Sequence, residues 1–281
     1  MAKRIAFFVS DRTAITSETL GHSLLTQFDG LEVEQVTLRF VDDRERAEKA
    51  RERINQAHRD TGLRPLVFST LVTDEVRDIV KSADCLFVDF FDTFLGPLER
   101  ELEMKSNHTA GRSHGLTNVD EYSSRIEAVN FTLNHDDGSS TKHLEEADII
   151  LLGISRTGKT PTCLYLSLHY GIRAANFPLT PDDLEELALP KALGPYRAKL
   201  FGLTTDPNRL QQIRNERLPN SRYASLAQCD FETRQAEALY RKYGIPYLLT
   251  TLKSVEEIAA TIIDKAALNH RKAYHRPPLH T

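Results

Sequence analysis

Residues 149–160 constrain the fold of this chain more than any other stretch. They read as a short apolar run, IILL, followed by GISRTGKT, which fits the phosphate-loop pattern G-x-x-x-x-G-K-[ST]. Glycines let such a loop curl so that consecutive backbone N–H groups point at phosphate oxygens. The lysine supplies a point charge, and the last hydroxyl can bind Mg²⁺. The pattern therefore predicts a phosphate-binding loop, although a chance glycine-rich turn is the alternative.

The flanking residues supply the strand and the helix that a phosphate loop needs. Residues 149–152 are apolar, as in a buried strand, and Pro161 falls where a first helical turn tolerates proline. Leu164, Leu168 and Gly171 suit a helix and its C-terminal cap. Lys159 is the predicted catalytic cation and Thr160 the predicted Mg²⁺ ligand. The predicted phosphate-binding residues are Gly153, Ile154, Ser155, Arg156, Thr157, Gly158, Lys159 and Thr160.

Strand-like and helix-like segments alternate along the whole chain. The expected strands are residues 3–9, 33–40, 65–71, 85–90, 149–152, 172–177, 199–203 and 245–250. The expected helices include residues 42–60, 73–83, 94–104, 122–133 and 225–243. This alternation predicts an α/β fold with mainly parallel sheets. We expect two α/β halves, residues 1–141 and 142–270, the second a phosphate-loop kinase-like domain, and a flexible tail at residues 271–281.

Two further segments could contribute chemistry. Residues 10–13, SDRT, follow the first strand; they could hold an anion at a helix N-terminus, or Ser10, Asp11 or Thr13 could simply cap that helix. Residues 135–138, HDDG, contain paired carboxylates. Asp136 and Asp137 could bind Mg²⁺ or act as a general base, or they could form an Asp-Gly turn.

Other polar residues also have two interpretations. Residues 105–120 lack apolar periodicity and carry His108, Arg112 and His114, so they form either a functional loop or a linker. Asp206 follows a predicted strand and precedes Pro207. It could hold a metal, but a cap for a helix that starts at Pro207 explains the proline better.

Composition excludes several classes of protein. The chain has 281 residues, of which 40% are hydrophobic and 27% charged, as in ordinary globular proteins. A net charge of −4 gives no nucleic-acid footprint. No apolar run approaches the ~20 residues needed to cross a bilayer, and the N-terminus lacks a secretory apolar region, so we expect a cytoplasmic protein. The three cysteines are scattered without metal or redox spacing.

Several motifs together resemble a known family. They are SD and TAIT near residues 10–16, RSHGL at 112–116, HDDG at 135–138, GISRTGKTPT at 153–162 and FGLT at 201–204. With SRYASL at 221–226, they are similar to the bacterial phosphoenolpyruvate synthase regulatory protein family, which is related to the plant regulatory protein of pyruvate, phosphate dikinase. The likeness covers nearly the whole chain. Arg12 stands where the family pattern has glycine, and Asp206 where asparagine is common.

The resemblance implies a bifunctional enzyme. Members of the family transfer the β-phosphoryl group of ADP to a threonine of phosphoenolpyruvate synthase, which inactivates the synthase and leaves AMP. They also use inorganic phosphate to remove that group, which releases pyrophosphate. The implied partners are therefore the synthase, ADP and inorganic phosphate, with Mg²⁺ as the metal. A homodimer is left open.

A phosphate loop by itself does not select this function. An ATP-dependent small-molecule kinase would share the loop, and so would a nucleotide-sensing module without turnover. We hypothesise that both directions of the reaction use one cradle, because each places a transferring phosphoryl group beside another phosphate. Lys159 would stabilise both, with Asp136 or Asp137 as the base or the metal anchor.

Overall fold

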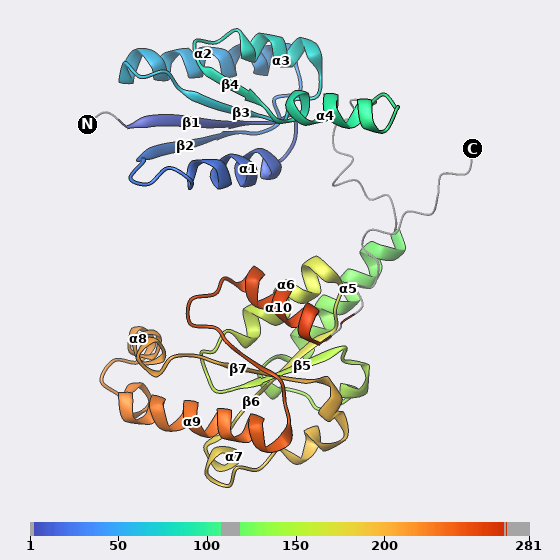
Figure 1. Ribbon diagram of the computed structural model, residues 1–281, viewed down its shortest axis with the longest axis vertical. Helices are drawn as coiled ribbons and strands as arrows, with labels where there is room; N and C mark the ends of the chain where they lie inside the picture. The colour runs from blue at the N-terminus through green and yellow to red at the C-terminus, as the bar shows by residue number, and fades with distance from the viewer. Residues whose placement is uncertain (1–2, 108–118, 267, 269–281) are drawn as a thin grey trace. The chain divides into compact units, whose positions relative to one another are not determined.

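The computed structural model describes residues 3–107, 119–266 and 268. The chain divides into two compact units, Met1–Gly115 and Leu116–Thr281 (Figure 1). Each unit is built on one four-stranded sheet whose strands pair in parallel. The expectation of two α/β halves with parallel sheets is confirmed.

The first unit alternates strands and helices without exception. In chain order its elements are β1 (Arg4–Val9), α1 (Ile15–Leu25), β2 (Val33–Leu38), α2 (Arg44–Thr61), β3 (Leu66–Ser69), α3 (Asp74–Lys81), β4 (Leu86–Asp89) and α4 (Phe90–Glu101). The strand order is β2-β1-β3-β4, so β1 lies inside the sheet. Because side chains alternate along a strand, each face of this sheet can bury its own cluster of apolar residues.

Neighbouring side chains of β1 are buried on opposite faces of the first sheet. Phe7 packs in a cluster with residues of α2 and α3, such as Ile54 and Val80. Phe8 packs in a second cluster with Leu25 of α1 and Phe90 of α4. The sheet is therefore covered by α2 and α3 on one face and by α1 and α4 on the other, as Figure 1 shows for α1, α2 and α3.

The second unit repeats the same strand order with longer connections. Its elements are α5 (Val119–Asn134), η1 (Asp136–Gly138), η2 (Leu144–Glu146), β5 (Ile149–Gly153), α6 (Lys159–Tyr170), β6 (Ala174–Pro178), α7 (Pro181–Glu185), η3 (Lys191–Lys199), β7 (Leu200–Thr204), α8 (Pro207–Arg217), η4 (Arg222–Ala224), α9 (Leu226–Tyr243), β8 (Tyr247–Leu249) and α10 (Val255–Lys265). The sheet order is β6-β5-β7-β8, with β5 inside.

Every residue of β5 is buried, which explains its continuous apolar sequence. Ile149 and Leu151 face a cluster that includes residues of α6 and α10. Ile150 and Leu152 face the opposite cluster, to which α7, α8 and α9 contribute. The phosphate-loop pattern thus begins at the end of a completely buried strand of the sheet.

Helix α5 belongs to the second unit. It packs on α6 and β6, and its Thr132 hydroxyl donates to the carbonyl oxygen of Ala174 in β6 at 2.8 Å. The structure therefore divides the chain before α5, whereas the sequence-based junction near Lys142 lies after it. Apolar periodicity shows that a helix is amphipathic but does not show which sheet its apolar side covers.

The expected helix at residues 94–104 begins earlier than predicted. Helix α4 starts at Phe90, because the carboxylate of Asp89 caps it by accepting from the amide of Asp92 at 2.9 Å. The remaining expected strands and helices are present with small shifts at their ends. All three cysteines are buried and unpaired.

Some expectations fall on residues outside the described part. They concern His108, Arg112 and His114 and the tail at residues 271–281. Among the helices that the structure describes, none combines the length and apolarity that a bilayer span requires.

Candidate phosphate-binding site

The phosphate-loop sequence forms the expected strand–loop–helix unit. Strand β5 ends at Gly153, residues 154–158 form the loop, and α6 begins at Lys159. Because β5 pairs with β6 on one side and β7 on the other, the loop lies at the carboxyl edge where the chain reverses its direction of progress across the sheet. Such switch points are where ligands bind in open α/β sheets.

The loop glycines meet two different demands. Gly158 has φ +90°, a left-handed conformation that a residue with a Cβ adopts only with strain. A Cβ on Gly153 would lie 2.8 Å from the carbonyl oxygen of Leu203 in β7, so this position requires glycine for close approach. Arg156 is also left-handed, with φ +75°, and is exposed. Consecutive amides can therefore turn toward a single anion, as in other phosphate cradles.

Lys159 is held inside this loop. Its side chain is only 5% exposed, and Nζ donates to the carbonyl oxygen of Ile154 at 3.0 Å. Burial lowers the pKa of Lys159 from 10.5 to about 8, although the nearby carboxylates of Asp137 and Asp136 act in the opposite direction. A bound phosphate would favour the charged form further. The lysine is thus positioned as the buried cation of the cradle.

Asp136 lies against the hydroxyl that the sequence predicts for Mg²⁺. Thr160 Oγ1 donates to Asp136 Oδ1 at 2.8 Å, and Asn176 Nδ2 donates to the same carboxylate oxygen and, at 3.2 Å, to Thr160 Oγ1. The threonine oxygen therefore keeps one lone pair for a cation. A hydroxyl backed by a carboxylate is a hard oxygen donor set, which suits Mg²⁺.

Asp137 occupies the exposed side of the same turn. It has φ +52°, and its amide donates to the side-chain oxygen of Asn176 at 2.8 Å. Its charge acts against the burial that lowers the pKa of Lys159. The structure therefore brings both aspartates to the loop but gives them different surroundings.

The turn that carries these aspartates is anchored from behind. His135 is buried, with Nδ1 2.7 Å from the carbonyl oxygen of Phe131 and Nε2 2.6 Å from that of Lys142. The amide of Asn176 in β6 donates to the carbonyl oxygen of His135 at 3.1 Å. HDDG thus forms a turn, η1, as one of its two interpretations expects. Its role as a metal ligand or base stays a prediction.

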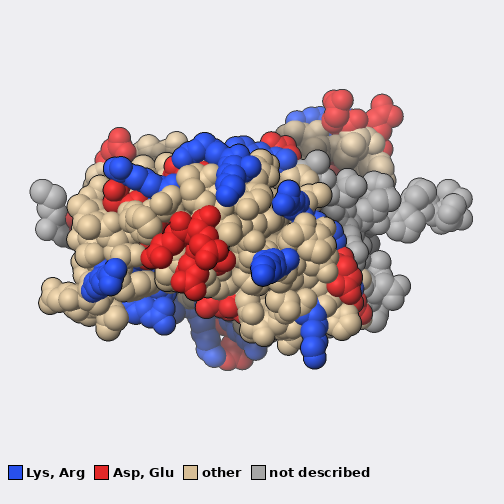
Figure 2. Space-filling model, turned by 90° about the horizontal axis from the view of Figure 1, so that it is seen from below, with Lys and Arg blue, Asp and Glu red and all other residues tan. Residues whose placement is uncertain are grey.

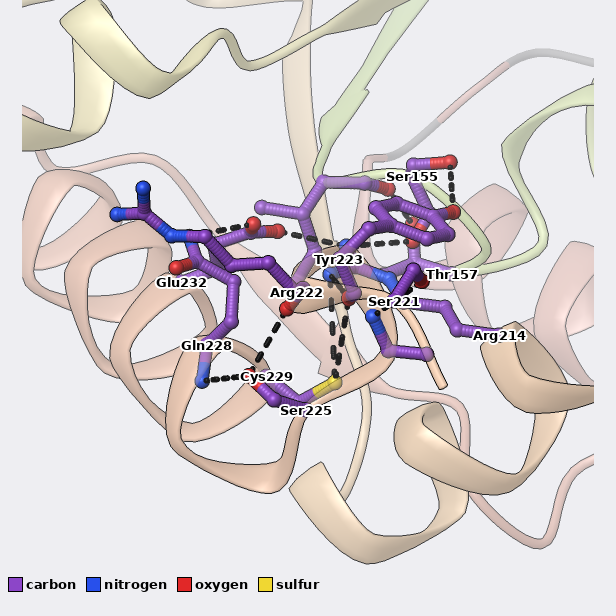
Figure 3. A network of polar contacts seen from close by, with 12 residues as sticks. Ser155, Thr157, Arg214, Ser221, Arg222, Tyr223, Ser225, Gln228, Cys229 and Glu232 are labelled. Carbon is purple, nitrogen blue, oxygen red and sulfur yellow. Dashed lines mark hydrogen bonds and ion pairs between the residues drawn. The ribbon is translucent and has the colours of Figure 1, made fainter. Parts of the chain in front are cut away.

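Sequence reasoning missed several residues that support the loop. The hydroxyl of Thr250, after β8, donates to the carbonyl oxygen of Thr157 at 3.2 Å, and Arg214 of α8 donates to that of Ser155 at 3.3 Å. Figure 3 shows Arg214 and Tyr223 converging on Ser155. Only Asn176 carried a usable signal, since it is a polar residue inside an apolar strand sequence.

Asp206 does not belong to this group. Its carboxylate accepts from the amides of Asn208 and Arg209 at 2.9 and 3.1 Å, with Pro207 as the first residue of α8. The cap interpretation is confirmed. Within the described ranges, no three His, Cys, Asp or Glu side chains gather closely enough to form a metal centre of their own.

Charged side chains of both signs share the surface. On the face shown in Figure 2, basic and acidic groups are interspersed around an acidic cluster. This mixture agrees with the net charge of −4 and differs from the basic stripe of a nucleic-acid-binding face.

Comparison with known proteins places this chain in a family. The sequence model of the kinase/pyrophosphorylase family matches residues 6–263, which is most of the chain. The chain belongs to the kinase/pyrophosphorylase family. The match includes both units, so the first unit is part of the family's common architecture and not an addition to the phosphate-loop unit.

Individual relatives support the same assignment. A protein of Laribacter hongkongensis named "Putative phosphoenolpyruvate synthase regulatory protein" is 54% identical over 270 residues, covering 96% of this chain and 98% of its own. Proteins with the same name from Alkalilimnicola ehrlichii and Marinobacter nauticus are 55% and 52% identical, again over 96% of this chain and 98% and 100% of their own. The resemblance drawn from the sequence motifs is confirmed at the level of the family.

Proposed function

We propose that this chain is a bifunctional regulator of phosphoenolpyruvate synthase. In one direction it transfers the β-phosphoryl group of ADP to a threonine of the synthase; in the other it removes that group with inorganic phosphate. The observation that carries the proposal is the contact of Asp136 with Thr160 beside the buried Lys159, because it joins a carboxylate pair to a phosphate loop. The family description and the names of the relatives supply the two reaction types and the target.

In the kinase direction, the loop would bind the phosphates of ADP. Its amides and Lys159 would neutralise charge on the transferring group, which is the main requirement of phosphoryl transfer. Asp137 would take the proton from the acceptor threonine, whose oxygen then bonds to the β-phosphorus. The bond from that phosphorus to the bridging oxygen breaks, and AMP leaves with the electron pair. Asp137 suits this role because it is exposed in the turn whose Asp136 contacts Thr160 of the loop pattern.

In the opposite direction, an oxygen of inorganic phosphate would bond to the phosphorus of phosphothreonine. The bond to the threonine oxygen breaks, that oxygen takes up a proton, and pyrophosphate leaves. Inorganic phosphate is already largely deprotonated near neutral pH, so the base matters less here than in the kinase direction. The same cradle serves both directions, because each brings two phosphoryl groups together.

Thr160 and Asp136 would hold Mg²⁺. Their oxygens match the ligands that this ion prefers, and the ion would neutralise charge on the phosphates. Holding Thr160 by its hydroxyl hydrogen fixes the direction of its remaining lone pair. Asp136 would thus orient Thr160 as a Mg²⁺ ligand, whereas Asp137 would accept the proton of the acceptor threonine.

The decisive experiment is incubation with purified synthase, its substrates and either ADP or ATP. We expect AMP to form from ADP, with a gain of one phosphoryl group on a threonine peptide by mass spectrometry. Consumption of ATP without labelling of the synthase would support a small-molecule kinase instead. Binding of nucleotide without AMP formation would support a sensing module.

A further inference from the structure

One buried arginine outside the phosphate-loop motif reaches that loop. Arg214, in the last turn of α8, is 0% exposed and is the largest side chain that is fully buried in the described residues. Burying a guanidinium is costly unless its charge and donors are matched. The groups that contact Arg214 therefore show which parts of the structure its guanidinium holds in position.

Arg214 and the tyrosine that stacks on it both contact one loop residue, Ser155. Nη2 donates to Glu232 Oε2 at 2.6 Å and to the carbonyl oxygen of Ser155 at 3.3 Å, while Nη1 donates to the carbonyl oxygen of Tyr223 at 3.0 Å. The guanidinium carbon lies 4.1 Å from the centre of the Tyr223 ring, and the hydroxyl of that ring is 2.9 Å from Ser155 Oγ. Figure 3 shows this network from α8, η4 and α9 closing on Ser155.

This network determines the direction of one peptide group. In a trans peptide the C=O and the following N–H point in opposite directions. With the Ser155 carbonyl held by Arg214, the amide of Arg156 must point away from Arg214. Arg156 is also in the left-handed region, with φ +75°, which a residue with a side chain occupies only when its surroundings hold it there.

Arg214 is not itself available to a ligand. Its charge is matched by Glu232, whose side chain is 13% exposed, and its guanidinium packs on the Tyr223 ring. Its remaining donor, Nε, is buried without a hydrogen-bond partner in the described residues. Lys159 remains the buried cation inside the loop. Arg214 can therefore affect a ligand only indirectly, through its hydrogen bond to the backbone carbonyl of Ser155.

We propose that Arg214 is a positioning residue for phosphate binding. By holding the Ser155 carbonyl, it directs the amide of Arg156 to the phosphate, and Tyr223 supports the same residue through its hydroxyl. The inference rests on the proposed function only in that residues 153–160 bind phosphate groups. It does not depend on which acceptor receives the phosphoryl group.

The test compares variants in the full-length chain. Arg214→Met combined with Glu232→Gln removes the arginine without leaving a buried unpaired carboxylate. The wild-type chain is the control, because Glu232→Gln alone would leave the buried guanidinium without its counter-charge. Glutamine at 232 retains an oxygen for the amide of Gln228, which now donates to Glu232 at 2.9 Å. We expect ADP and inorganic phosphate to bind about tenfold to a hundredfold more weakly to the double variant than to the control, by titration calorimetry.

A spectroscopic readout separates positioning from general destabilisation. The ¹H–¹⁵N resonance of Arg156 should shift when inorganic phosphate is added to the control protein and should shift much less in the double variant. Arg214→Lys should behave like the double variant, because one ammonium cannot reach the carbonyls of both Ser155 and Tyr223 in the same fork geometry. Tyr223→Phe, which keeps the ring, should weaken binding only a few-fold.

Two results would overturn the inference. One is binding of ADP and phosphate by the folded double variant, or by Arg214→Lys if the double variant does not fold, as tightly as by the control. The other is an unchanged response of the Arg156 amide in those variants. Failure of the wild-type chain to bind ADP or phosphate would overturn the phosphate loop itself, whereas normal binding without kinase activity would leave the role of Arg214 intact.

Discussion

The two units place a loop of the same length at the same point of the same topology. Residues 10–14 join β1 to α1, and residues 154–158 join β5 to α6. In each sheet the strand before the loop is the second in the strand order and has a neighbour on both sides. Each loop ends in a left-handed residue before its helix, Ala14 with φ +63° and Gly158 with φ +90°. The sequences SDRTAIT and ISRTGKT also align, with arginine and threonine in common.

The side chains of the two loops differ in ways that matter for an anion. Ser10 Oγ accepts from the amide of Arg12 at 3.2 Å, whereas the corresponding Ile154 is apolar and buried in the core. Ile15, which is 53% exposed, stands where the second loop has the buried Lys159. The first loop thus uses one of its own backbone donors, the amide of Arg12, internally. It has no counterpart of the buried ammonium group of Lys159.

The comparison teaches that the fold provides the same strand–loop–helix connection in both units. The side chains of each loop then decide how well it suits phosphate. It also corrects one sequence-based expectation. The N-cap of α1 is Ala14 without any side-chain cap, so capping by Ser10, Asp11 or Thr13 is wrong. The left-handed Ala14 leads the chain into the helix. The hydroxyl of Ser10 accepts from the amide of Arg12 inside the loop and so does not cap the helix. Whether the first loop holds an anion stays a prediction, and the comparison indicates weaker binding there.

The largest expected effect is at the lysine position. Lys159→Ala should lower both activities by about 10²–10³, because it removes the buried cation that stabilises the transferring group. Ile15→Ala is the matched control in the first loop and should leave both rates unchanged, since that side chain is largely exposed. The measurement is the initial rate of AMP formation and of pyrophosphate formation for each variant. Full phosphate-dependent dephosphorylation by Lys159→Ala would show that the two reactions use separate cradles.

The next effect separates the two aspartates of the turn η1, which contacts α6 just after the second loop through Asp136 and Thr160. Asp137→Asn should depress the kinase direction by about 10² and the phosphorolytic direction less, since only threonine must lose a proton on attack. Asp136→Asn should depress both directions comparably and raise the Mg²⁺ concentration required, because Asp136 orients Thr160. Both rates are measured across a Mg²⁺ titration. If neither variant changes either rate by a few-fold, residues 135–138 are only a turn.

The shared arginines give a smaller and more selective test. Arg156→Gln should weaken ADP binding about tenfold, because its exposed guanidinium lies on the phosphate loop and charge-assisted contacts to phosphate are strong. Arg12→Gln, at the aligned position, should change ADP binding by less than twofold. Titration calorimetry of the two variants checks this. Equal losses in both would mean that the first loop also contributes to nucleotide binding.

The smallest expected effect is a pH dependence that only Lys159 confers. With its pKa at about 8, the lysine is mostly charged at pH 7 and mostly neutral at pH 8.5. If the neutral form does not bind phosphate, affinity should fall about fourfold over that interval, with proton uptake on binding. Calorimetry in buffers of different ionisation enthalpy measures that uptake. Uptake that persists in Lys159→Met would assign it to another group.

The same shift predicts a change in stability of defined sign. In the unfolded chain the pKa of Lys159 is at its ordinary value of 10.5, above the folded value of about 8. Between these values the unfolded state binds more protons, so this residue makes the free energy of unfolding rise with pH in that window and fall as pH drops toward 8. Denaturant titrations of the wild type and Lys159→Met should differ in this slope. Parallel slopes would contradict a lowered pKa.

The sequence by itself determined the local parts of this protein. The apolar run at residues 149–152, the glycine pattern after it and the proline after Asp206 each depend on neighbours a few residues away, and each predicted its element correctly. The capping box of Ser254 and Glu257 that opens α10 depends on residues just as close in the sequence. Strand alternation was sufficient for the α/β class, because burial on both faces leaves a continuous apolar signature.

Only the tertiary structure decided which distant groups meet. Asp136 reaches Thr160 because α5 packs on α6 and brings the following turn against β6, and no local pattern encodes that packing. Arg214 reads as one more charged residue on a charged helix, yet it is fully buried against Ser155. A polar side chain can be buried only where the folded chain supplies partners for its hydrogen bonds and charge. These contacts therefore follow from packing between elements and not from periodicity within them.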